Sequence, residues 1–394
     1  MPFDARSGMN LFDGILVAGA AFGAYGGWKL GFLQRLSGWL GAAAGLGLAL
    51  LLLPKLSRLS GVSSDIAILT LSAAVLFLAF MVGQAIGSTV GSWLRRGVDS
   101  SAARGLDALG GALLGVLGVV VLAWLILPVM AETKGWPSSA ARGSVIAREI
   151  SNSLPSPPSQ ITDLERQLTG GEFPQVFSGL RSAPEIVAPP EGSPISQDQL
   201  TAASRSSVRI EASACDRVQA GSGFFVGDNL IATNAHVVSG STSVQVVTAD
   251  EGEVTTGQVV AFDPSVDLAL IATDLNRPAL PLATPAVGDR GLVMGFPGGG
   301  PFAPSPFEVG ERVDASGYDI YDRSKVTRDL LVLGSNLEPG DSGSAVLRAD
   351  GSAIGVAVAI APDKPGVAYA LSATELSQLL QQGTGAVVST GSCV

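Results

Sequence analysis

The stretch Leu337-Glu-Pro-Gly-Asp-Ser-Gly-Ser344 decides the fold of the C-terminal half of this chain. Its Gly340-Asp-Ser-Gly343 turn places the Ser342 hydroxyl at the tip of a tight loop, and the glycines allow backbone N–H groups to converge on one point. A serine hydroxyl becomes a nucleophile only when a base takes its proton. We therefore expect Ser342 to need an imidazole, and we expect the N–H groups of Gly340 and Ser342 to form an oxyanion hole.

The one histidine in the chain, His236, is the candidate base, and it lies in Ala232-Thr-Asn-Ala-His-Val-Val238. A carboxylate is needed to orient its ring and to stabilise the charged form. Between His236 and Ser342, the stretch Phe262-Asp-Pro-Ser-Val-Asp-Leu-Ala-Leu-Ile271 offers two aspartates. We choose Asp267 because it opens the apolar run that follows, whereas Asp263 precedes a proline and is typical of a turn.

Each of these three residues alone has an ordinary structural explanation. A serine in a turn, a histidine in a core and an aspartate at the start of a strand are all common. The three together follow the chain order His, Asp, Ser, which is the order of chymotrypsin and differs from that of subtilisins and α/β-hydrolases. The combination favours nucleophilic catalysis.

The sequence around these residues resembles the trypsin-like proteases, most closely the bacterial HtrA branch. Three signatures carry this resemblance, namely Thr233-Asn-Ala-His-Val-Val238, Asp267-Leu-Ala-Leu270 and Gly340-Asp-Ser-Gly343. The resemblance covers Val208 to Leu380 and implies a chymotrypsin-like pair of six-stranded β-barrels with the site between them. In one departure from the family pattern, Ser344 stands where a second glycine is usual.

The same resemblance places Asn336, six residues before Ser342, near the base of the S1 pocket. A neutral amide offers no negative charge to a basic side chain. We therefore expect small or apolar side chains at the substrate's P1 position rather than Arg or Lys.

The N-terminal third has the composition of a membrane domain. The whole chain is 47% apolar and 15% charged, and its mean hydropathy is +0.40, which is more apolar than a typical soluble protein. Four apolar runs are each close to the ~20 residues that a helix needs to cross a bilayer. They are Leu11–Trp28, Leu36–Leu53, Ile66–Met81 and Ala108–Val129. We expect an all-α bundle of four transmembrane helices over residues 1–131.

Short motifs in this region resemble the colicin V production (CvpA) family of membrane domains. They are Asp13, Lys29-Leu-Gly-Phe-Leu-Gln-Arg35 and the stretch Gly105–Gly115. A CvpA-like domain joined to an HtrA-like protease resembles the MarP-type membrane-anchored periplasmic serine proteases of actinobacteria, which are associated with acid resistance. This implies a multi-pass inner-membrane protein with its protease domain outside the cytoplasm. Basic residues near the spans are equally numerous on both sides, so charge does not decide the orientation.

Residues 132–201 are rich in Ser, Pro and Gly, and we expect them to form a linker. Within it, Ile161–Leu168 is expected to form a short helix capped by Thr162. An exposed segment of this kind is also a target for self-cleavage. From Ala202 onward, short alternating runs separated by glycine turns predict an all-β domain over residues 202–394.

The chain has two cysteines, Cys215 and Cys393, and both fall in the β-rich domain. An even pair that brackets one domain indicates a disulfide where the compartment is oxidising. Two unrelated buried thiols remain the alternative, because spacing alone does not establish a pairing.

The leading hypothesis is a membrane-anchored extracytoplasmic serine endopeptidase that cleaves envelope proteins and serves resistance to acid or oxidative stress. Its expected partners are protein or peptide substrates and membrane lipid. The net charge of −10 argues against nucleic acid, and neither a cofactor nor a metal is expected. One alternative is a catalytically silent scaffold that only binds peptides. Another is a transporter or channel regulated by the protease, with Asp13 and Asp107 as intramembrane carboxylates, although placement at helix starts or at the interface explains both more simply.

Overall fold

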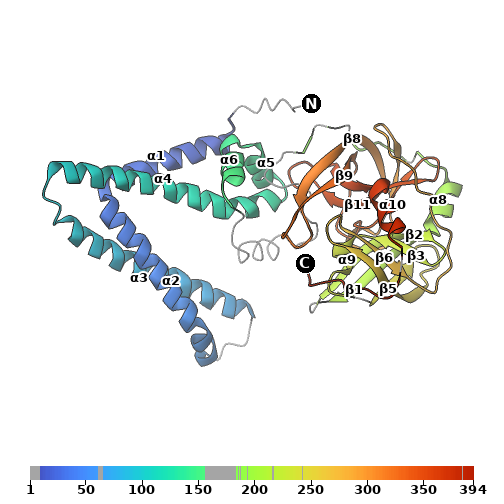
Figure 1. Ribbon diagram of the computed structural model, residues 1–394, viewed down its shortest axis with the longest axis horizontal. Coiled ribbons are helices and arrows are strands. Elements are labelled where there is room, and N and C mark those ends of the chain that lie inside the picture. Colours follow the sequence, from blue (N-terminus) through green and yellow to red (C-terminus); the bar gives the residue numbers. More distant parts are fainter. Residues whose placement is uncertain are drawn as a thin grey trace. The chain divides into compact units, whose positions relative to one another are not determined.

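The computed structural model divides the chain into two compact units (Figure 1). One unit combines Met1–Ile126 with Ser144–Leu154, and the other combines Leu127–Gly143 with Pro155–Val394. The structure describes residues 9–60, 65–155, 183–184, 186, 188–192, 194–214, 217–241, 243–383 and 385–394.

Four long helices contain the four apolar runs. They are α1 (Leu11–Leu30), α2 (Phe32–Ser60), α3 (Asp65–Arg95) and α4 (Ser101–Glu132). Among the described residues, Ala74–Arg95 and Ser101–Glu132 are long and apolar enough to cross a membrane by length and composition. The number of four spans stays a prediction.

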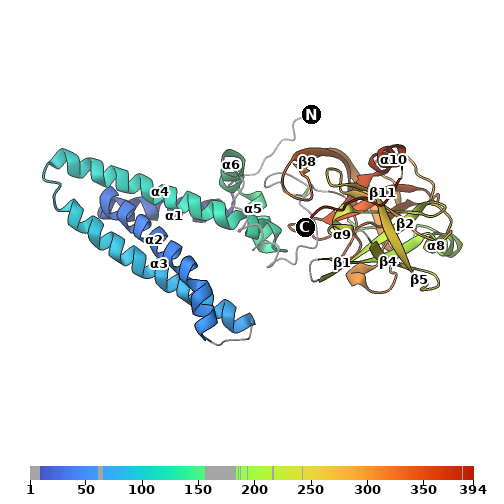
Figure 2. The ribbon, with the colours of Figure 1, turned by 60° about the horizontal axis from the view of Figure 1, so that its bottom comes forward.

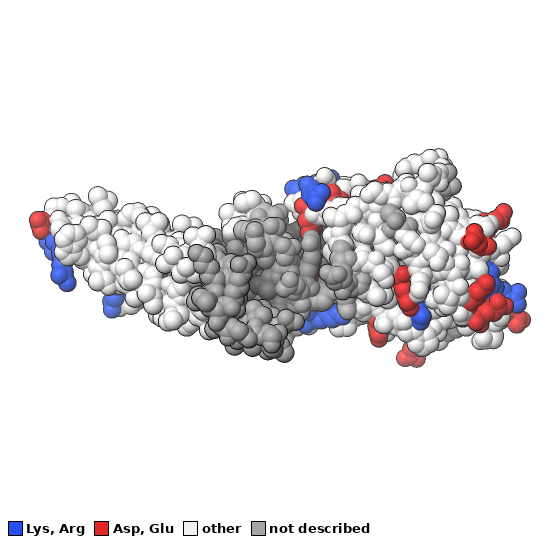
Figure 3. Space-filling view, turned by 90° about the horizontal axis from the view of Figure 1, so that it is seen from below, with Lys and Arg blue, Asp and Glu red and all other residues white. Residues whose placement is uncertain are grey.

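Large apolar side chains lie exposed along these helices, among them Phe22, Phe77 and Leu113. On the face drawn in Figure 3, the helical unit shows few charged side chains, and most of these gather at one end. Exposed apolar surface of this extent is what lipid-facing helices present.

Glycines let the helices pack backbone against backbone, α1 on α4 and α2 on α3 (Figure 2). A Cβ atom added at Gly27 would lie 1.9 Å from the carbonyl oxygen of Gly111, and one at Gly41 would lie 2.2 Å from that of Gly83. Such contacts leave no room for any side chain, which explains the four-residue spacing of glycines in these segments.

Asp13 and Asp107 hold helix ends in place. Asp13 accepts hydrogen bonds from the N–H of Asn10 (2.8 Å), the N–H of Ile146 (2.9 Å) and the hydroxyl of Ser144 (2.6 Å). Asp107 pairs with Arg95 at 2.8 Å and accepts the N–H of Leu33 at 2.9 Å. These contacts favour a structural explanation for both residues over ion transport.

The segment expected as a linker contains more helix than its composition predicts. It includes α5 (Trp136–Gly143), α6 (Val145–Ser153) and α8 (Gln197–Ser204). The start of α6 is stabilised by Ser144, whose hydroxyl accepts the N–H of Ala147, and by Asp13, a residue far away in the sequence. The helix expected at residues 161–168 lies outside the described residues. The boundaries 1–131, 132–201 and 202–394 stay predictions.

The second unit contains two closed six-stranded antiparallel barrels within its described residues, as the sequence predicts (Figure 1). The first barrel has the order β1-β2-β3-β6-β5-β4. Its strands are β1 (Ser207–Ala214), β2 (Arg217–Gly227), β3 (Leu230–Thr233), β4 (Ser243–Thr248), β5 (Val254–Asp263) and β6 (Leu268–Ala272).

The second barrel has the order β10-β11-β12-β9-β8-β7. Its strands are β7 (Arg290–Met294), β8 (Ser305–Tyr318), β9 (Lys325–Gly334), β10 (Ala345–Arg348), β11 (Ala353–Ile360) and β12 (Val367–Ser372). The short helix η1 (Pro297–Gly299) follows β7, and the helix α10 (Ala373–Gln381) follows β12 with Ser372 as its N-cap.

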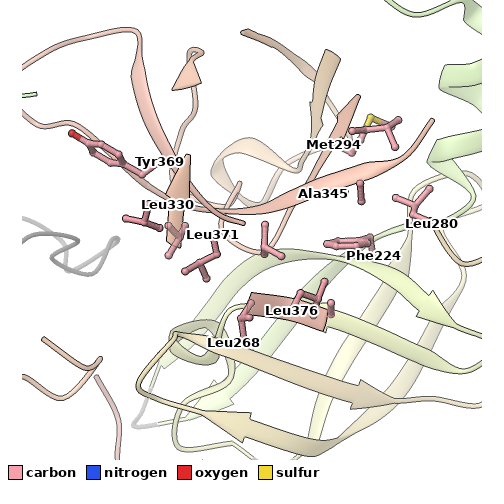
Figure 4. Packing of buried hydrophobic residues seen from close by; sticks show 14 of the residues in the cluster. Phe224, Leu268, Leu280, Met294, Leu330, Ala345, Tyr369, Leu371 and Leu376 are labelled. Carbon is pink, nitrogen blue, oxygen red and sulfur yellow. The ribbon is translucent and has the colours of Figure 1, made fainter. Parts of the chain in front are cut away.

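One apolar cluster joins the two barrels. It brings Phe224 and Leu268 of the first barrel together with Met294, Leu330 and Leu371 of the second (Figure 4). Each of these side chains is fully buried. Since the cluster is shared, the barrels are fixed against each other, and loops from both meet along the seam.

Candidate active site

The carboxylate of Asp267 holds His236 at two points. His236 lies in α9 (Ala235–Val238), directly after β3. Its Nδ1 lies 2.8 Å from Oδ2 of Asp267, and its backbone N–H donates to Oδ1 at 2.9 Å. A carboxylate on Nδ1 favours the tautomer with the proton on that nitrogen, which leaves Nε2 to act as a base.

Asp267 reaches this position through an unusual backbone conformation. Its φ is +62°, in the left-handed region, and the side-chain amide of Asn234 donates to its carbonyl oxygen at 2.9 Å. Asp263 instead accepts the N–H of Ser265 at 2.8 Å within the preceding turn. The structure therefore brings Asp267 to the imidazole and keeps Asp263 in the turn, as the sequence indicated.

Arg328 of β9 anchors this turn from the second barrel. Its side chain is buried, and it donates to the carbonyl oxygens of Ser265 (2.8 Å) and Tyr318 (2.7 Å). Burial lowers the pKa of the Arg328 guanidinium, and the nearby Asp267 carboxylate acts in the opposite direction. The sequence alone does not point to Arg328, because nothing in its local sequence indicates a contact with a turn some sixty residues earlier.

The nucleophile turn meets the His236 segment at Gly221 of β2. A Cβ atom added there would lie 2.6 Å from the Val237 side chain and 3.2 Å from the carbonyl oxygen of Ser342. Ser342 is 3% exposed, and its hydroxyl makes no hydrogen bond to any described protein group. Catalytic hydrogen bonds are often formed fully only when substrate is bound.

The loop geometry explains the glycine before the nucleophile. Gly340 has a φ of +98°, and a Cβ atom there would lie 2.4 Å from the carbonyl oxygen of Phe296 and 2.7 Å from the nitrogen of Gly299. Both the conformation and the close packing exclude a side chain. The N–H groups of Gly340 and Ser342 donate to no acceptor among the described residues.

Asp341, between these two donors, is a buried carboxylate. Its Oδ2 accepts the N–H of Glu338 at 2.9 Å. Burial raises the pKa of Asp341 to about 7, although the hydrogen bond from Glu338 partly opposes this. The titration of Asp341 therefore falls near neutral pH.

Of the other residues that the sequence singles out, Asn336 and Cys393 are described by the structure and Cys215 is not. Asn336 is exposed and lies beside Gly366, where an added Cβ atom would be 3.6 Å from its Oδ1. Cys393 is not a free thiol. Cys215 lies outside the described residues, so the disulfide between them stays a prediction. No cluster of three or more metal-ligating side chains occurs in the described part of the chain.

Comparisons with known proteins agree with this architecture. Residues 12–155 match the colicin V production protein family, and residues 221–356 match the trypsin-like peptidase domain family. The chain is 31% identical over 397 residues to serine protease Rv3671c of Mycobacterium tuberculosis H37Rv, an alignment that covers 97% of this chain and 98% of that protein. The chain belongs to the family of this serine protease.

Further similarities support membership of the Rv3671c family. The crystal structure of the Rv3671c protease in its active form covers 56% of this chain and 100% of that one, with 34% identity and a TM-score of 0.51. A putative serine protease of Synechocystis, HhoA, is 31% identical over 165 residues, which are 38% of this chain and 39% of that protein. The expectation of a membrane-anchored, HtrA-like serine protease is confirmed.

Proposed function

We propose that Ser342 is the nucleophile of this serine endopeptidase, that His236 is its general base and that Asp267 orients the base. The two-point contact between Asp267 and His236 is the observation that carries this proposal. It fixes the ring and its tautomer in a chain that has no other histidine. The glycine-flanked turn would provide the nucleophile, and its two unused N–H groups would provide the oxyanion hole.

The proposed reaction proceeds in two halves. The Ser342 oxygen bonds to the scissile carbonyl carbon while Nε2 of His236 takes the hydroxyl proton, and the N–H groups of Gly340 and Ser342 stabilise the oxyanion. The C–N bond then breaks as His236 gives the proton to the leaving amine. In the second half, water attacks the acyl-enzyme, passes a proton to His236, and releases the acid and the Ser342 hydroxyl.

The substrates that we propose are proteins or peptides of the cell envelope. The resemblance to HtrA proteases puts the neutral amide of Asn336 near the base of the S1 pocket, which supports small or apolar side chains at P1. Membrane lipid is the other proposed partner. A role in resistance to acid or oxidative stress is consistent with the resemblance to MarP-type proteases.

We also propose that α1 to α4 form a multi-pass anchor in the inner membrane, with the β-barrel unit outside the cytoplasm. Each of the four helices is at least 20 residues long, which suffices to cross a bilayer. A predicted disulfide between Cys215 and Cys393 would fit an oxidising compartment. Alkaline phosphatase fused to the C-terminus should be active in cells. If this fusion is inactive and a reporter that fluoresces only in the cytoplasm is fluorescent at the same position, the protease unit faces the cytoplasm and the proposed orientation is wrong.

The catalytic assignment is tested with a fluorophosphonate probe on the full-length protein in detergent. Ser342→Ala should lose labelling and casein hydrolysis. Ser344→Ala is a matched control, because Ser344 is also buried, lies two residues away and has a hydroxyl without a described partner. It should keep both signals. Persistent hydrolysis by Ser342→Ala would reject the assignment, and wild-type protein that is folded but never labelled or active would favour the peptide-binding scaffold.

A further inference from the structure

Ser222 connects the first barrel to the nucleophile loop through two hydrogen bonds. It lies in β2, is fully buried, and is flanked by Gly221 and Gly223. Its N–H donates to the carbonyl oxygen of Ser342 at 2.7 Å, and its hydroxyl donates to the carbonyl oxygen of Gly340 at 2.7 Å. Ser222 thus contacts both residues whose N–H groups would face the oxyanion.

The same hydroxyl also fixes a second loop. It accepts the N–H of Phe296 at 3.1 Å, immediately before η1. From that loop, the N–H of Gly298 donates to the carbonyl oxygen of Pro339 at 2.5 Å. One buried hydroxyl therefore uses both its donor and its acceptor capacity to connect β2, the loop around η1 and the nucleophile loop.

These carbonyl contacts set the direction of the N–H groups. In a trans peptide group, the C=O and the N–H point to opposite sides, and no cis peptide occurs in the described part of the chain. The carbonyl of Pro339 bonds to Gly298, so the Gly340 N–H in the same peptide group points away from Gly298. The next peptide group is held by Ser222 at the Gly340 carbonyl and by Glu338 at the Asp341 N–H (3.0 Å).

Gly340 is the point at which this arrangement needs support. A glycine rotates easily about φ and ψ, and here it adopts φ +98°. Rotation of the Pro339–Gly340 peptide group would turn the Gly340 N–H away from the oxyanion. Rotation of the Gly340–Asp341 peptide group would displace the following Asp341–Ser342 group, which carries the second donor. Among the described residues, the Ser222 hydroxyl is the side-chain donor to the Gly340 carbonyl.

We propose that Ser222 is a positioning residue: it holds the Gly340–Asp341 and Ser342–Gly343 peptide groups, and through them it keeps the neighbouring groups that carry the two oxyanion donors in the orientation that catalysis requires. This inference rests on the proposed roles of Ser342 and Gly340. Ser222 touches no substrate. It acts through the backbone of the nucleophile loop, so it affects transition-state stabilisation more than substrate binding.

The test compares variants of the full-length protein in detergent, with an apolar-P1 peptide anilide as substrate. Ser222→Ala should lower kcat by about ten- to a hundredfold, less than or equal to the loss of one oxyanion donor, with little change in KM. The affinity for a peptide boronate of the same sequence, which forms a tetrahedral adduct with the serine, should fall in parallel with kcat/KM. Ser222→Thr keeps the hydroxyl and should recover most of the lost rate.

Ser206→Ala is the matched control. Ser206 is buried directly before β1, and its hydroxyl donates to the carbonyl of Pro278 at 2.6 Å, without contact to the nucleophile loop. It should keep kcat within about twofold, at a similar loss of stability. Equal kinetics for the two alanine variants, or a lower kcat in Ser222→Ala with unchanged boronate affinity, overturns the proposal. If Ser222→Ala does not fold, the Ser222→Thr variant provides the test. A Ser222→Thr protein that has wild-type stability but binds the boronate at least tenfold more weakly would also overturn the proposal. Activity that survives Ser342→Ala would instead reject the proposed function.

Discussion

Asp267 bonds to both the backbone N–H and the ring Nδ1 of His236, at 2.9 Å and 2.8 Å. One carboxylate therefore fixes the position of the α9 turn and the tautomer of its imidazole. A substitution that keeps one of these contacts and loses the other would separate the effect on the fold from the effect on catalysis.

Asp267→Asn provides this separation. The amide oxygen can still accept one N–H, but it carries no charge to stabilise a protonated ring. We expect kcat to fall by about 10⁴-fold with the fold intact, measured by peptide anilide hydrolysis and circular dichroism. Asp263→Asn is the control, since Asp263 serves the adjacent turn, and it should stay within about threefold of wild type. The reverse ranking would show that the wrong aspartate has been assigned.

Gly340→Ala tests the packing of the nucleophile loop. Gly351 also has a positive φ, +86°, but an added Cβ atom there meets nothing within 4 Å. Gly351→Ala should therefore cost only about 1–2 kcal/mol of stability and leave kcat unchanged. Gly340→Ala should in addition lower kcat by at least about a hundredfold, because its Cβ would displace the Phe296 carbonyl. Similar kcat values for the two variants would contradict the described loop geometry.

The raised pKa of Asp341 predicts a pH dependence of stability. The carboxyl loses its proton near pH 3.8 in the unfolded chain and near pH 7 in the folded protein. Between these values the folded state holds the extra proton, so the free energy of unfolding falls as the pH rises toward 7 and then levels off. At about 1.4 kcal/mol per pKa unit, the whole interval corresponds to on the order of 4 kcal/mol.

Asp341→Asn removes this titration but can still accept the N–H of Glu338. Thermal unfolding from pH 5 to pH 8 should show that the wild type loses stability with rising pH more steeply than the variant does. Parallel curves would mean that Asp341 is ionised across this range in the folded protein.

Arg328→Met should loosen the turn that carries Asp267. It removes two charged hydrogen bonds to the carbonyl oxygens of Ser265 and Tyr318, each worth about 1.5–3 kcal/mol, and we expect lower stability together with lower kcat. Arg312→Met is the comparison, because Arg312 pairs with Asp329 at an exposed site where an ion pair contributes about 0–1 kcal/mol. Urea unfolding of both variants checks this, and equal losses would count against a special role for Arg328.

In the helical unit, Gly27→Val should disrupt the contact between α1 and α4. The new side chain would have to occupy the space of the Gly111 carbonyl group. We expect the unfolding temperature in detergent to fall by on the order of 5 °C. Gly47→Val, at a glycine with nothing within 4 Å, should have little effect. A drop of equal size for both variants would indicate a loss of backbone flexibility rather than of packing space.

The parts that sequence predicts well are those encoded locally. Strand β4, for example, alternates exposed and buried residues over Ser243–Val246, and this period-2 pattern is visible in the sequence. His236, Asp267 and Ser342 each lie in a short motif whose chemistry is specific, so the structure could be expected to bring His236 and Asp267 together.

The parts that sequence misses depend on contacts between distant segments. Ser222 contacts a loop 118 residues later, and Asp13 accepts the N–H of Ile146 in the first turn of α6, 133 residues later. Neither local sequence indicates which distant segment the residue contacts. Only the three-dimensional structure pairs them with their partners.

The division of the site between the barrels has a consequence during synthesis. A ribosome that has completed the first barrel has produced an imidazole and its carboxylate, but the hydroxyl that they would activate follows only after β9. The second barrel closes only after β10 has been synthesised and pairs with β7, and after β12 has been synthesised and pairs with β9. The nascent polypeptide therefore cannot hydrolyse peptide bonds while most of it is being synthesised. Its own unfolded segments are not cleaved by it during that period.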